Sequence, residues 1–253
     1  MKILSWNVNS VRVRQQQVED ILATGSVDII ALQETKCSKE DFPTLNSGFE
    51  IFALGNKGLS GVAFVSRIPF SVERTSLPQE GHQPARFLHV IVQGVHLINV
   101  YVPNGESLTS DKFVYKKTFM QDLASYLAPL ANEKVLVMGD FNIVPSVKDV
   151  YAPEHFSKRL LFSPAERQWL SHVCSLGFMD VGGVFLHNAH QEERYTWWDY
   201  RNMADFPVKG LRIDLMLATY SALDCITGYG HIRAQRQKER PSDHIPVWSS
   251  LCL

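Results

Sequence analysis

The sequence predicts an α/β protein in which two β-sheets pack face to face and helices cover their outer surfaces. The chain has 253 residues, of which 45% are hydrophobic and 20% charged, a composition that fits a globular protein with a large core. Apolar runs of strand length alternate with segments that have helical spacing. Some apolar runs also follow one another directly, so antiparallel strand pairs are expected beside parallel ones.

Several apolar runs predict buried or half-buried strands. These runs are Lys2–Val8, Val27–Leu32, Gly61–Val65, Leu88–Val102, Lys134–Met138 and Leu211–Ala218. Gly94 indicates a hairpin turn or bulge that divides the fourth run into Leu88–Val92 and Val95–Val102. A further strand-like segment ends the chain after Pro246.

Helical spacing appears between these runs. One apolar face consists of Val18, Ile21 and Leu22, and another consists of Phe119, Leu123, Tyr126, Leu127 and Leu130. The clearest helix begins at Ser163, which can cap it, with Pro164 in the first turn and Glu166 able to complete a capping box. Gly177 can end this helix.

Composition restricts the partners and the compartment. The formal net charge is -1 and the pI is about 6.8, so nucleic acid would have to meet a local basic patch. Apolar runs are shorter than the roughly 18 residues of a membrane span, and no signal peptide is expected. The four cysteines lack CxxC spacing, which favours reduced thiols in a cytoplasmic protein.

Polar side chains follow the first two predicted strands. Asn7 and Asn9 can ligate a hard cation or hold a phosphate, but such a pair can also form a turn that caps the next helix. Glu34 ends the second run, where a buried carboxylate needs a cation or a donor. A magnesium ion and an ion pair with Lys36 are equally good explanations.

Two later runs also end in polar residues. The Tyr101 phenol can donate to a phosphate oxygen, although an interfacial tyrosine before a Pro-Asn-Gly turn is the simpler alternative. Asp140 and Asn142 share a face if the chain stays extended. A carboxylate that takes a proton from water and an amide that orients the water form a hydrolytic pair, and a capped turn is the alternative.

Two aspartates and a histidine complete the polar set. Asp214 lies in an otherwise apolar run and needs a partner, which could be His244 or Arg212. Asp243 and His244 lie between two prolines, which favours a loop before the last strand. A carboxylate beside an imidazole suits a metal site or a proton-transfer site.

Seven motifs in order along the chain carry a resemblance to a known family. They are Trp6–Asn9, Leu32–Lys36, Asn99–Gly105, Gly139–Asn142, Tyr195–Arg201, Leu211–Asp214 and Ser242–His244. Each is weak alone, but in this order they are specific, and the chain resembles the exonuclease III family of DNA-repair nucleases within the endonuclease/exonuclease/phosphatase superfamily. The resemblance covers essentially the whole chain. It implies one domain, residues 1–253, folded as a four-layer α/β sandwich with a pseudo-twofold repeat and an active site at one edge of the two sheets.

The resemblance also implies a divalent cation, Mg²⁺ or Mn²⁺, and a set of site residues. The residues implied for the metal site are Asn7, Glu34, Asp140, Asn142, Asp243 and His244. The residues implied for catalysis are Tyr101, Asp140, Asn142, Asp214 and His244. Among them, Asp140 would activate the attacking water or donate a proton, and the Asp214–His244 pair would hold the scissile phosphate. The residues implied for DNA contact are Arg86, Asn104, Trp197 and Arg201.

The implied function is metal-dependent hydrolysis of DNA phosphodiesters in base-excision repair, with 3′-to-5′ exonuclease and 3′-phosphatase or phosphodiesterase activity. The implied partner is double-stranded DNA with 3′ ends, nicks or abasic sites, bound by a monomer without a membrane. Family members that cut abasic sites strongly tend to have a small residue in the loop before the helix at Ser163. Because Leu160 and Leu161 occupy that loop here, we expect AP endonuclease activity to be weak.

Some interpretations stay open from the sequence alone. At most one of Trp197 and Trp198 is expected to reach DNA, and the basic run His231–Arg240 is either a phosphate patch or a solvated surface. A small-phosphoester phosphatase of the same superfamily would differ in the motifs around Tyr101 and Trp197. A non-catalytic nucleic-acid-binding relative would lack some of the acidic and imidazole residues, all of which are present here.

Overall fold

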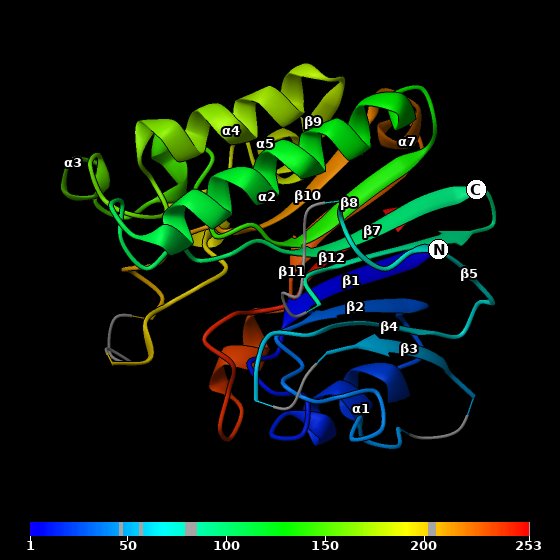
Figure 1. Cartoon of the computed structure of the whole chain (residues 1–253). Coiled ribbons are helices and arrows are strands. Elements are labelled where there is room, and N and C mark those ends of the chain that lie inside the picture. Colours follow the sequence, from blue (N-terminus) through cyan, green and yellow to red (C-terminus); the bar gives the residue numbers. More distant parts are fainter. Residues whose placement is uncertain (46–47, 56–57, 79–84, 202–205, 253) are drawn as a thin grey trace.

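The computed structural model describes residues 1–45, 48–55, 58–78, 85–201 and 206–252. Figure 1 shows two β-sheets lying one above the other, with α1 (Gln15–Ala23) on one outer face and α2 (Asp111–Leu127) and α4 (Pro164–Ser175) on the other. The layers therefore run helix, sheet, sheet, helix, as the family resemblance implied.

The first sheet is built around the parallel pair β1 (Lys2–Asn7) and β2 (Ile29–Gln33), which α1 connects. Its six strands have the order β11-β12-β1-β2-β4-β3, and every other pair is antiparallel. The remaining strands are β3 (Glu50–Leu54), β4 (Val62–Ser66), β11 (Ile226–His231) and β12 (Val247–Leu251).

The second sheet repeats this plan around the parallel pair β7 (Val95–Tyr101) and β8 (Val135–Asp140), which α2 connects. Its order is β5-β6-β7-β8-β10-β9, again with antiparallel strands outside the central pair. The remaining strands are β5 (Ser71–Arg74), β6 (Phe87–Val92), β9 (Phe178–Asp180) and β10 (Asp214–Thr219). Matching strand orders and directions confirm the expected pseudo-twofold repeat.

The part of the chain that the structure describes also contains short helices. They are α3 (Pro153–Phe156), α5 (Val181–Phe185), α6 (Gln191–Arg194), α7 (Tyr220–Leu223), and the 3-10 helices η1 (Ala128–Leu130), η2 (Val147–Asp149) and η4 (Arg233–Gln237). Among the described residues, no helix has both the length and the apolar composition that crossing a bilayer requires.

Three apolar clusters hold the layers together. Between the sheets, Ile3 and Phe64 of one sheet share a cluster with Leu97 and Met138 of the other. The outward-facing residues of β7 and β8 pack instead against α2 and α4, and those of β1 and β2 pack against α1. Strands with both faces buried are mostly apolar instead of alternating between apolar and polar residues, which is why β1, β2, β7 and β8 were recognisable in the sequence.

The element predictions were largely confirmed, with informative differences. Gly94 forms the predicted turn at φ 79°, and Ser163 and Glu166 form the predicted capping box. The run Leu211–Ala218 becomes a strand only at Asp214, because the Leu211 amide donates to the Trp197 carbonyl at 3.0 Å instead of joining the sheet. Strands β3, β5, β9 and β11 were not predicted.

Candidate active site

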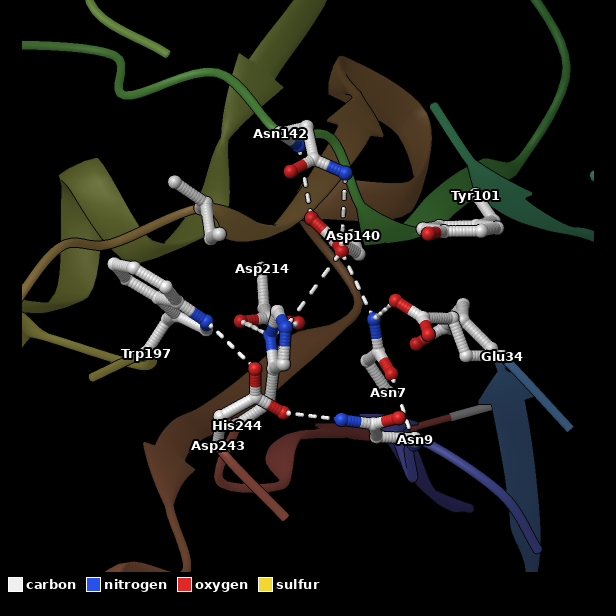
Figure 2. Close-up of polar contacts among 12 residues, drawn as sticks. Asn7, Asn9, Glu34, Tyr101, Asp140, Asn142, Trp197, Asp214, Asp243 and His244 are labelled. Atoms are coloured by element: carbon white, nitrogen blue, oxygen red, sulfur yellow. Dashed lines mark hydrogen bonds and ion pairs between the residues drawn. The ribbon is translucent and has the colours of Figure 1, made fainter. Parts of the chain in front are cut away.

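The predicted polar residues meet at one edge of the sandwich, where the carboxyl ends of both parallel pairs lie (Figure 2). Asn7 ends β1 and Glu34 follows β2, whereas Tyr101 ends β7 and Asp140 ends β8. Asp214 opens β10 directly opposite Asp140 in the antiparallel register. The loop before β12 brings Asp243 and His244 to the same place, so both halves of the fold contribute.

Asp140 is the centre of the hydrogen-bond network. Its carboxylate is 1% exposed and accepts from the Asn142 backbone amide at 2.8 Å, the Asn142 side-chain amide at 3.2 Å and the Asn7 side-chain amide at 2.9 Å. Burial, with the neighbouring charges of Asp214 and Glu34, raises the pKa of Asp140 to about 7 despite the opposing effect of His244. A carboxyl group with this pKa can exchange a proton at neutral pH.

Asn142 reaches Asp140 through a turn rather than along an extended strand. β8 ends at Asp140, and Asn142 has a φ of 49°, in the left-handed region. The sequence argument that the two side chains share a face of an extended chain therefore does not describe this segment. Asparagine tolerates the left-handed conformation better than most residues, which permits the turn.

His244 and Asp214 form a buried ion pair. The imidazole Nδ1 lies 2.9 and 3.0 Å from the two Asp214 oxygens, and Nε2 lies 3.8 Å from Asp140 Oδ2. Burial alone would lower the pKa of His244, but Asp214 and Asp140 outweigh it and raise that pKa to about 10. The imidazole is therefore charged at neutral pH. Its Nδ1–H donates to the Asp214 carboxylate, and its Nε2–H is on the side of Asp140.

Glu34 lies beside Asn7 on the other side of Asp140. The Asn7 side-chain amide donates to Glu34 at 3.0 Å, and Lys36 lies 2.9 Å from the second Glu34 oxygen. Although burial opposes it, Lys36 and the Asn7 hydrogen bond lower the pKa of Glu34, so this carboxylate is ionised. The ion pair with Lys36 is thus confirmed, and the role of Glu34 as a metal ligand stays a prediction.

Asn7 presents its nitrogen to the carboxylates. Its oxygen accepts from the Asn9 backbone amide at 3.0 Å, while its nitrogen bridges Glu34 and Asp140. In this arrangement Asn7 orients the two carboxylates, and a ligand role would require its amide to rotate. Asn9 also participates, since its side-chain nitrogen donates to Asp243 at 3.1 Å.

The donor set suits a hard divalent cation. Asp140, Asp214 and His244 each present a potential ligand atom within 4.8 Å of the others, and the Glu34 carboxylate adjoins them through Asn7. Because the His244 imidazole is charged and bonded to Asp214, it is a poor ligand in this state. The carboxylate oxygens of Glu34 and Asp140 fit Mg²⁺ or Mn²⁺, which would also offset their negative charge.

Tyr101 and the four residues predicted to contact DNA differ in how far they are buried. Tyr101 is half-buried, with the Arg86 guanidinium 4.4 Å from its ring centre, and burial and the Glu34 and Asp140 carboxylates raise its pKa. Asn104 is exposed and donates to Asn142 Oδ1 at 3.1 Å. Trp197 is half-buried and donates to Asp243 at 3.0 Å. Arg201 is 86% exposed and pairs with Asp199.

Of two predictions about neighbouring segments, the one on the tryptophan pair agrees with the structure and the one on the basic run needs revision. Trp198 is fully buried in a cluster with Tyr195 and Ile245, so Trp197 is the member of the pair that faces the site. The basic run His231–Arg240 is not one surface, because Arg236 is 3% exposed and Arg233 stacks over Trp198. The buried guanidinium of Arg236 thus belongs to the interior.

The loop before α4 is packed closely beside the site. Leu161 is 9% exposed, has a φ of 73°, and shares an apolar cluster with Val144, Leu211 and Ile213, against which Trp197 also packs. Leucine is unusual in the left-handed region, where glycine is favoured. Leu160 is half-buried on the rim of the same cluster.

Sequence reasoning missed two buried ion-pair networks near the site. Arg212 does not pair with Asp214, as one alternative proposed, but with Asp149 at 2.7 Å and Asp180 at 2.6 Å. Lys116 of α2 and Glu166 of α4 form a second pair, with both side chains 0% exposed. The sequence contained one sign of the second pair: Lys116 lies on the same face of the helix as Phe119 and Leu123, where the other residues are apolar.

Comparisons with known proteins agree with this geometry. The Endonuclease/Exonuclease/phosphatase family matches residues 4–244. Exodeoxyribonuclease III of Haemophilus influenzae is 32% identical over 98% of this chain and 99% of its own length. An exodeoxyribonuclease of Bacillus subtilis is 30% identical over 98% of both.

Solved structures show the same similarity over the complete chain. The 3′-5′ exonuclease NExo from Neisseria meningitidis is 35% identical with a TM-score of 0.94, and an AP endonuclease from Archaeoglobus fulgidus is 29% identical with a TM-score of 0.91. Both alignments cover all of each chain. The chain therefore belongs to the endonuclease/exonuclease/phosphatase family and, within it, to the group of exodeoxyribonuclease III.

Proposed function

We propose that this DNA-repair nuclease acts chiefly at the 3′ ends of double-stranded DNA, where it removes nucleotides and blocking phosphates with the help of Mg²⁺ or Mn²⁺. The observation that carries the proposal is the buried Asp140 carboxylate, held between two amides and beside the charged His244–Asp214 pair. A monomer suffices for this activity, because every residue of the proposed site comes from one chain.

Asp140 is the proposed general base. A pKa near 7 allows it to accept a proton from water at neutral pH, and the Asn7 and Asn142 amides fix its orientation. The water then attacks the phosphorus in line with the leaving oxygen. Removal of a positioned base typically lowers the rate by roughly 10²- to 10⁴-fold.

His244 and Tyr101 are the proposed donors to the phosphate. His244 is charged at neutral pH, so its Nε2–H can donate to a phosphate oxygen while Asp214 holds the ring. The raised pKa of Tyr101 keeps its phenol protonated and able to donate. Asn104 and Trp197 lie at the rim of the site, where they can contact the DNA, and the exposed Arg201 and the Arg86 guanidinium are further candidate contacts.

Glu34 is the carboxylate that would hold the cation, with Asp140 supplying the neighbouring negative charge. Asp243, which bonds to Asn9 and Trp197, borders the same place. When bound, the cation would act as a Lewis acid that neutralises charge on the phosphate and stabilises the leaving oxygen. Lys36 keeps Glu34 ionised and so maintains its affinity for a cation.

The preference for ends rests on the loop before α4. Leu161 and its apolar cluster occupy the space beside Trp197, where the sugar of an internal abasic site would have to fit if the DNA continued past the scissile phosphate. A related structure, described as a 3′ phosphatase from Neisseria bound to product DNA hairpin, is 35% identical with a TM-score of 0.94, which is consistent with action on ends. The similarity to an AP endonuclease makes internal incision the second candidate activity.

One assay distinguishes these functions. Labelled duplexes carrying a recessed 3′ end, a 3′-phosphate or an internal abasic analogue are incubated with the protein, either with Mg²⁺ or with chelator. We expect hydrolysis of the first two substrates with Mg²⁺, little incision of the third, and loss of all activity with chelator. Incision of the abasic duplex at a rate equal to 3′-phosphate removal would overturn the preference for ends. Binding of all duplexes without hydrolysis would identify a non-catalytic relative.

A further inference from the structure

A buried lysine and a buried glutamate contact the backbone of the loops that carry Asn104, Asn142 and Leu161. Lys116 Nζ is 2.5 Å from Glu166 Oε1, and both side chains are 0% exposed. Burial of a charged pair carries a large desolvation cost, and a hydrophobic pair of similar volume is often as stable. A gain in stability therefore does not by itself explain why this ion pair is buried here.

The lysine holds the backbone of two proposed site residues. Its ammonium group donates to the Asn104 carbonyl at 3.1 Å and to the Asn142 carbonyl at 2.7 Å. These two asparagines are also joined by their side chains at 3.1 Å, and Asn142 donates to Asp140 through its backbone and side-chain amides. The position of the proposed base thus depends on a loop that Lys116 fixes from behind.

The glutamate holds the loop that borders the 3′ side of the site. Glu166 Oε1 accepts from the Leu161 backbone amide at 3.1 Å, and Oε2 accepts from the Ser163 backbone amide at 3.0 Å and its hydroxyl at 2.7 Å. With the bond from Lys116, this carboxylate accepts four hydrogen bonds on two oxygens. A capping residue of α4 is in this way tied to the catalytic loop.

Close packing at Gly105 strengthens the connection. A Cβ on this glycine, whose φ is 101°, would lie 3.0 Å from Leu160 Cδ1 and 3.3 Å from Lys116 Cδ. Space between the Asn104 turn, the Leu160 side chain and the Lys116 stem is therefore filled. The three segments are therefore in close contact at Gly105.

We propose that Lys116 and Glu166 are positioning residues that join the catalytic loop at Asn142 to the substrate-bordering loop at Leu160–Ser163. The proposal rests on the function proposed above. According to this proposal, the pair fixes the position of the Asp140 base and also the position of the loop that borders the 3′ side of the site. Loosening the pair lowers kcat and weakens the discrimination between 3′-phosphate and internal abasic duplexes, while the KM for the 3′-phosphate duplex changes little.

The test compares the variant Lys116→Met/Glu166→Gln with its two single variants and with Lys117→Met. Each single variant leaves one buried charge without its partner and is expected to melt at lower temperature. The double variant removes both charges and is expected to melt above both single variants, although the Asn104 and Asn142 carbonyls lose their donor. Lys117 is the next residue of α2 and is exposed, so Lys117→Met is the matched control and should behave as wild type.

We expect the double variant to keep a kcat roughly 10- to 100-fold below wild type, because methionine donates no hydrogen bond to the Asn104 and Asn142 carbonyls and the base shifts. If the pair only stabilises the fold, the double variant has the wild-type kcat at temperatures well below its melting temperature. A folded double variant with wild-type kcat would overturn the proposal.

Two further measurements keep the test decisive. If the double variant does not fold, Ser163→Ala is used, which keeps both charges and removes two hydrogen bonds of the Ser163 hydroxyl, the one it donates to Glu166 Oε2 and the one it accepts from the Glu166 backbone amide. We expect kcat to fall about threefold, and an unchanged kcat contradicts the proposal. The side-chain amide resonances of Asn104 and Asn142 should shift in the double variant but not in Lys117→Met. These resonances report on position even if the wild-type protein hydrolyses no duplex, an outcome that would refute the proposed function instead.

Discussion

The two halves of this protein share one strand plan but place their key carboxylates in opposite environments. In the half built on β1 and β2, Glu34 lies beside Lys36 and its pKa is lowered. In the half built on β7 and β8, Asp140 is buried beside Asp214 and its pKa is raised to about 7. The repeated strand plan brings the Glu34 and Asp140 carboxylates to one edge of the sheets. Their different neighbours keep Glu34 ionised and give Asp140 a pKa at which it can accept a proton.

The halves also differ in how their loops are held. In the first half, Arg14 at the start of α1 donates to the carbonyls of Asn9 and Pro241, both at 2.7 Å. In the second half, Lys116 within α2 donates to the carbonyls of Asn104 and Asn142. A buried cation from each connecting helix segment thus fixes the backbone of the loops, which allows short polar side chains to converge accurately.

The largest expected effect separates the two carboxylates. Asp140→Asn should lower kcat by roughly 100-fold or more at every Mg²⁺ concentration, because an amide cannot take the proton from water. Glu34→Gln should keep a higher rate at saturating Mg²⁺, and its main effect should be to raise the Mg²⁺ concentration needed for half-maximal rate. Initial rates on a 3′-phosphate duplex across a Mg²⁺ series measure both effects. Near-full turnover by Asp140→Asn would show that another group is the base.

The pH dependence of the rate should follow Asp140. Below a pH of about 7 its carboxyl group is increasingly protonated and cannot act as a base, so kcat/KM should fall about tenfold per pH unit as the pH decreases. A bound cation favours the ionised form, so this ascending limb should move to lower pH as Mg²⁺ increases. Profiles at two Mg²⁺ concentrations test the shift. If Mg²⁺ does not move the ascending limb, the group that titrates is not part of the Glu34 and Asp140 carboxylate cluster.

The His244–Asp214 pair should contribute to stability with the opposite pH dependence. Its folded-state pKa of about 10 lies above the unfolded value of about 6.5, so the contribution is fully present below pH 6.5 and is lost as the pH rises through 10. His244→Gln should reduce the free energy of unfolding by about 2 kcal/mol at pH 6. Denaturant unfolding at pH 6 and pH 10 gives the comparison. An equal difference at both pH values would mean that the imidazole is not charged in the fold.

The smallest expected effect concerns the boundary of the site. Leu161→Gly removes the apolar side chain at a φ that glycine adopts without strain, and we expect internal abasic incision to rise about tenfold while 3′-phosphate removal changes little. Val114→Gly, at an exposed apolar position of α2, is the control. No gain in abasic incision by Leu161→Gly would mean that this loop does not set the preference for ends.

How much the sequence predicted depended on whether the signal was local. The central strands and the helix at Ser163 were recognisable because continuous apolar runs and a capping box are local patterns. Strand β5 is exposed throughout, β9 has three residues, and β11 contains two glycines, so these lacked such patterns. The site residues were predicted from motifs at strand ends, but the partners Asp149, Asp180 and Glu166 are distant in sequence and carry no local sign of pairing.

The most direct test of the central claim, that carboxylates from both halves meet at one cation, is Mg²⁺ binding measured by calorimetry. Wild-type protein freed of metal is compared with Glu34→Gln, Asp140→Asn and the control Glu133→Gln, an exposed carboxylate at the opposite end of β8. We predict that each of the first two variants weakens binding about tenfold or more, while the control binds as wild type does. Undiminished binding by either Glu34→Gln or Asp140→Asn would contradict the account, because the cation would then depend on one half alone.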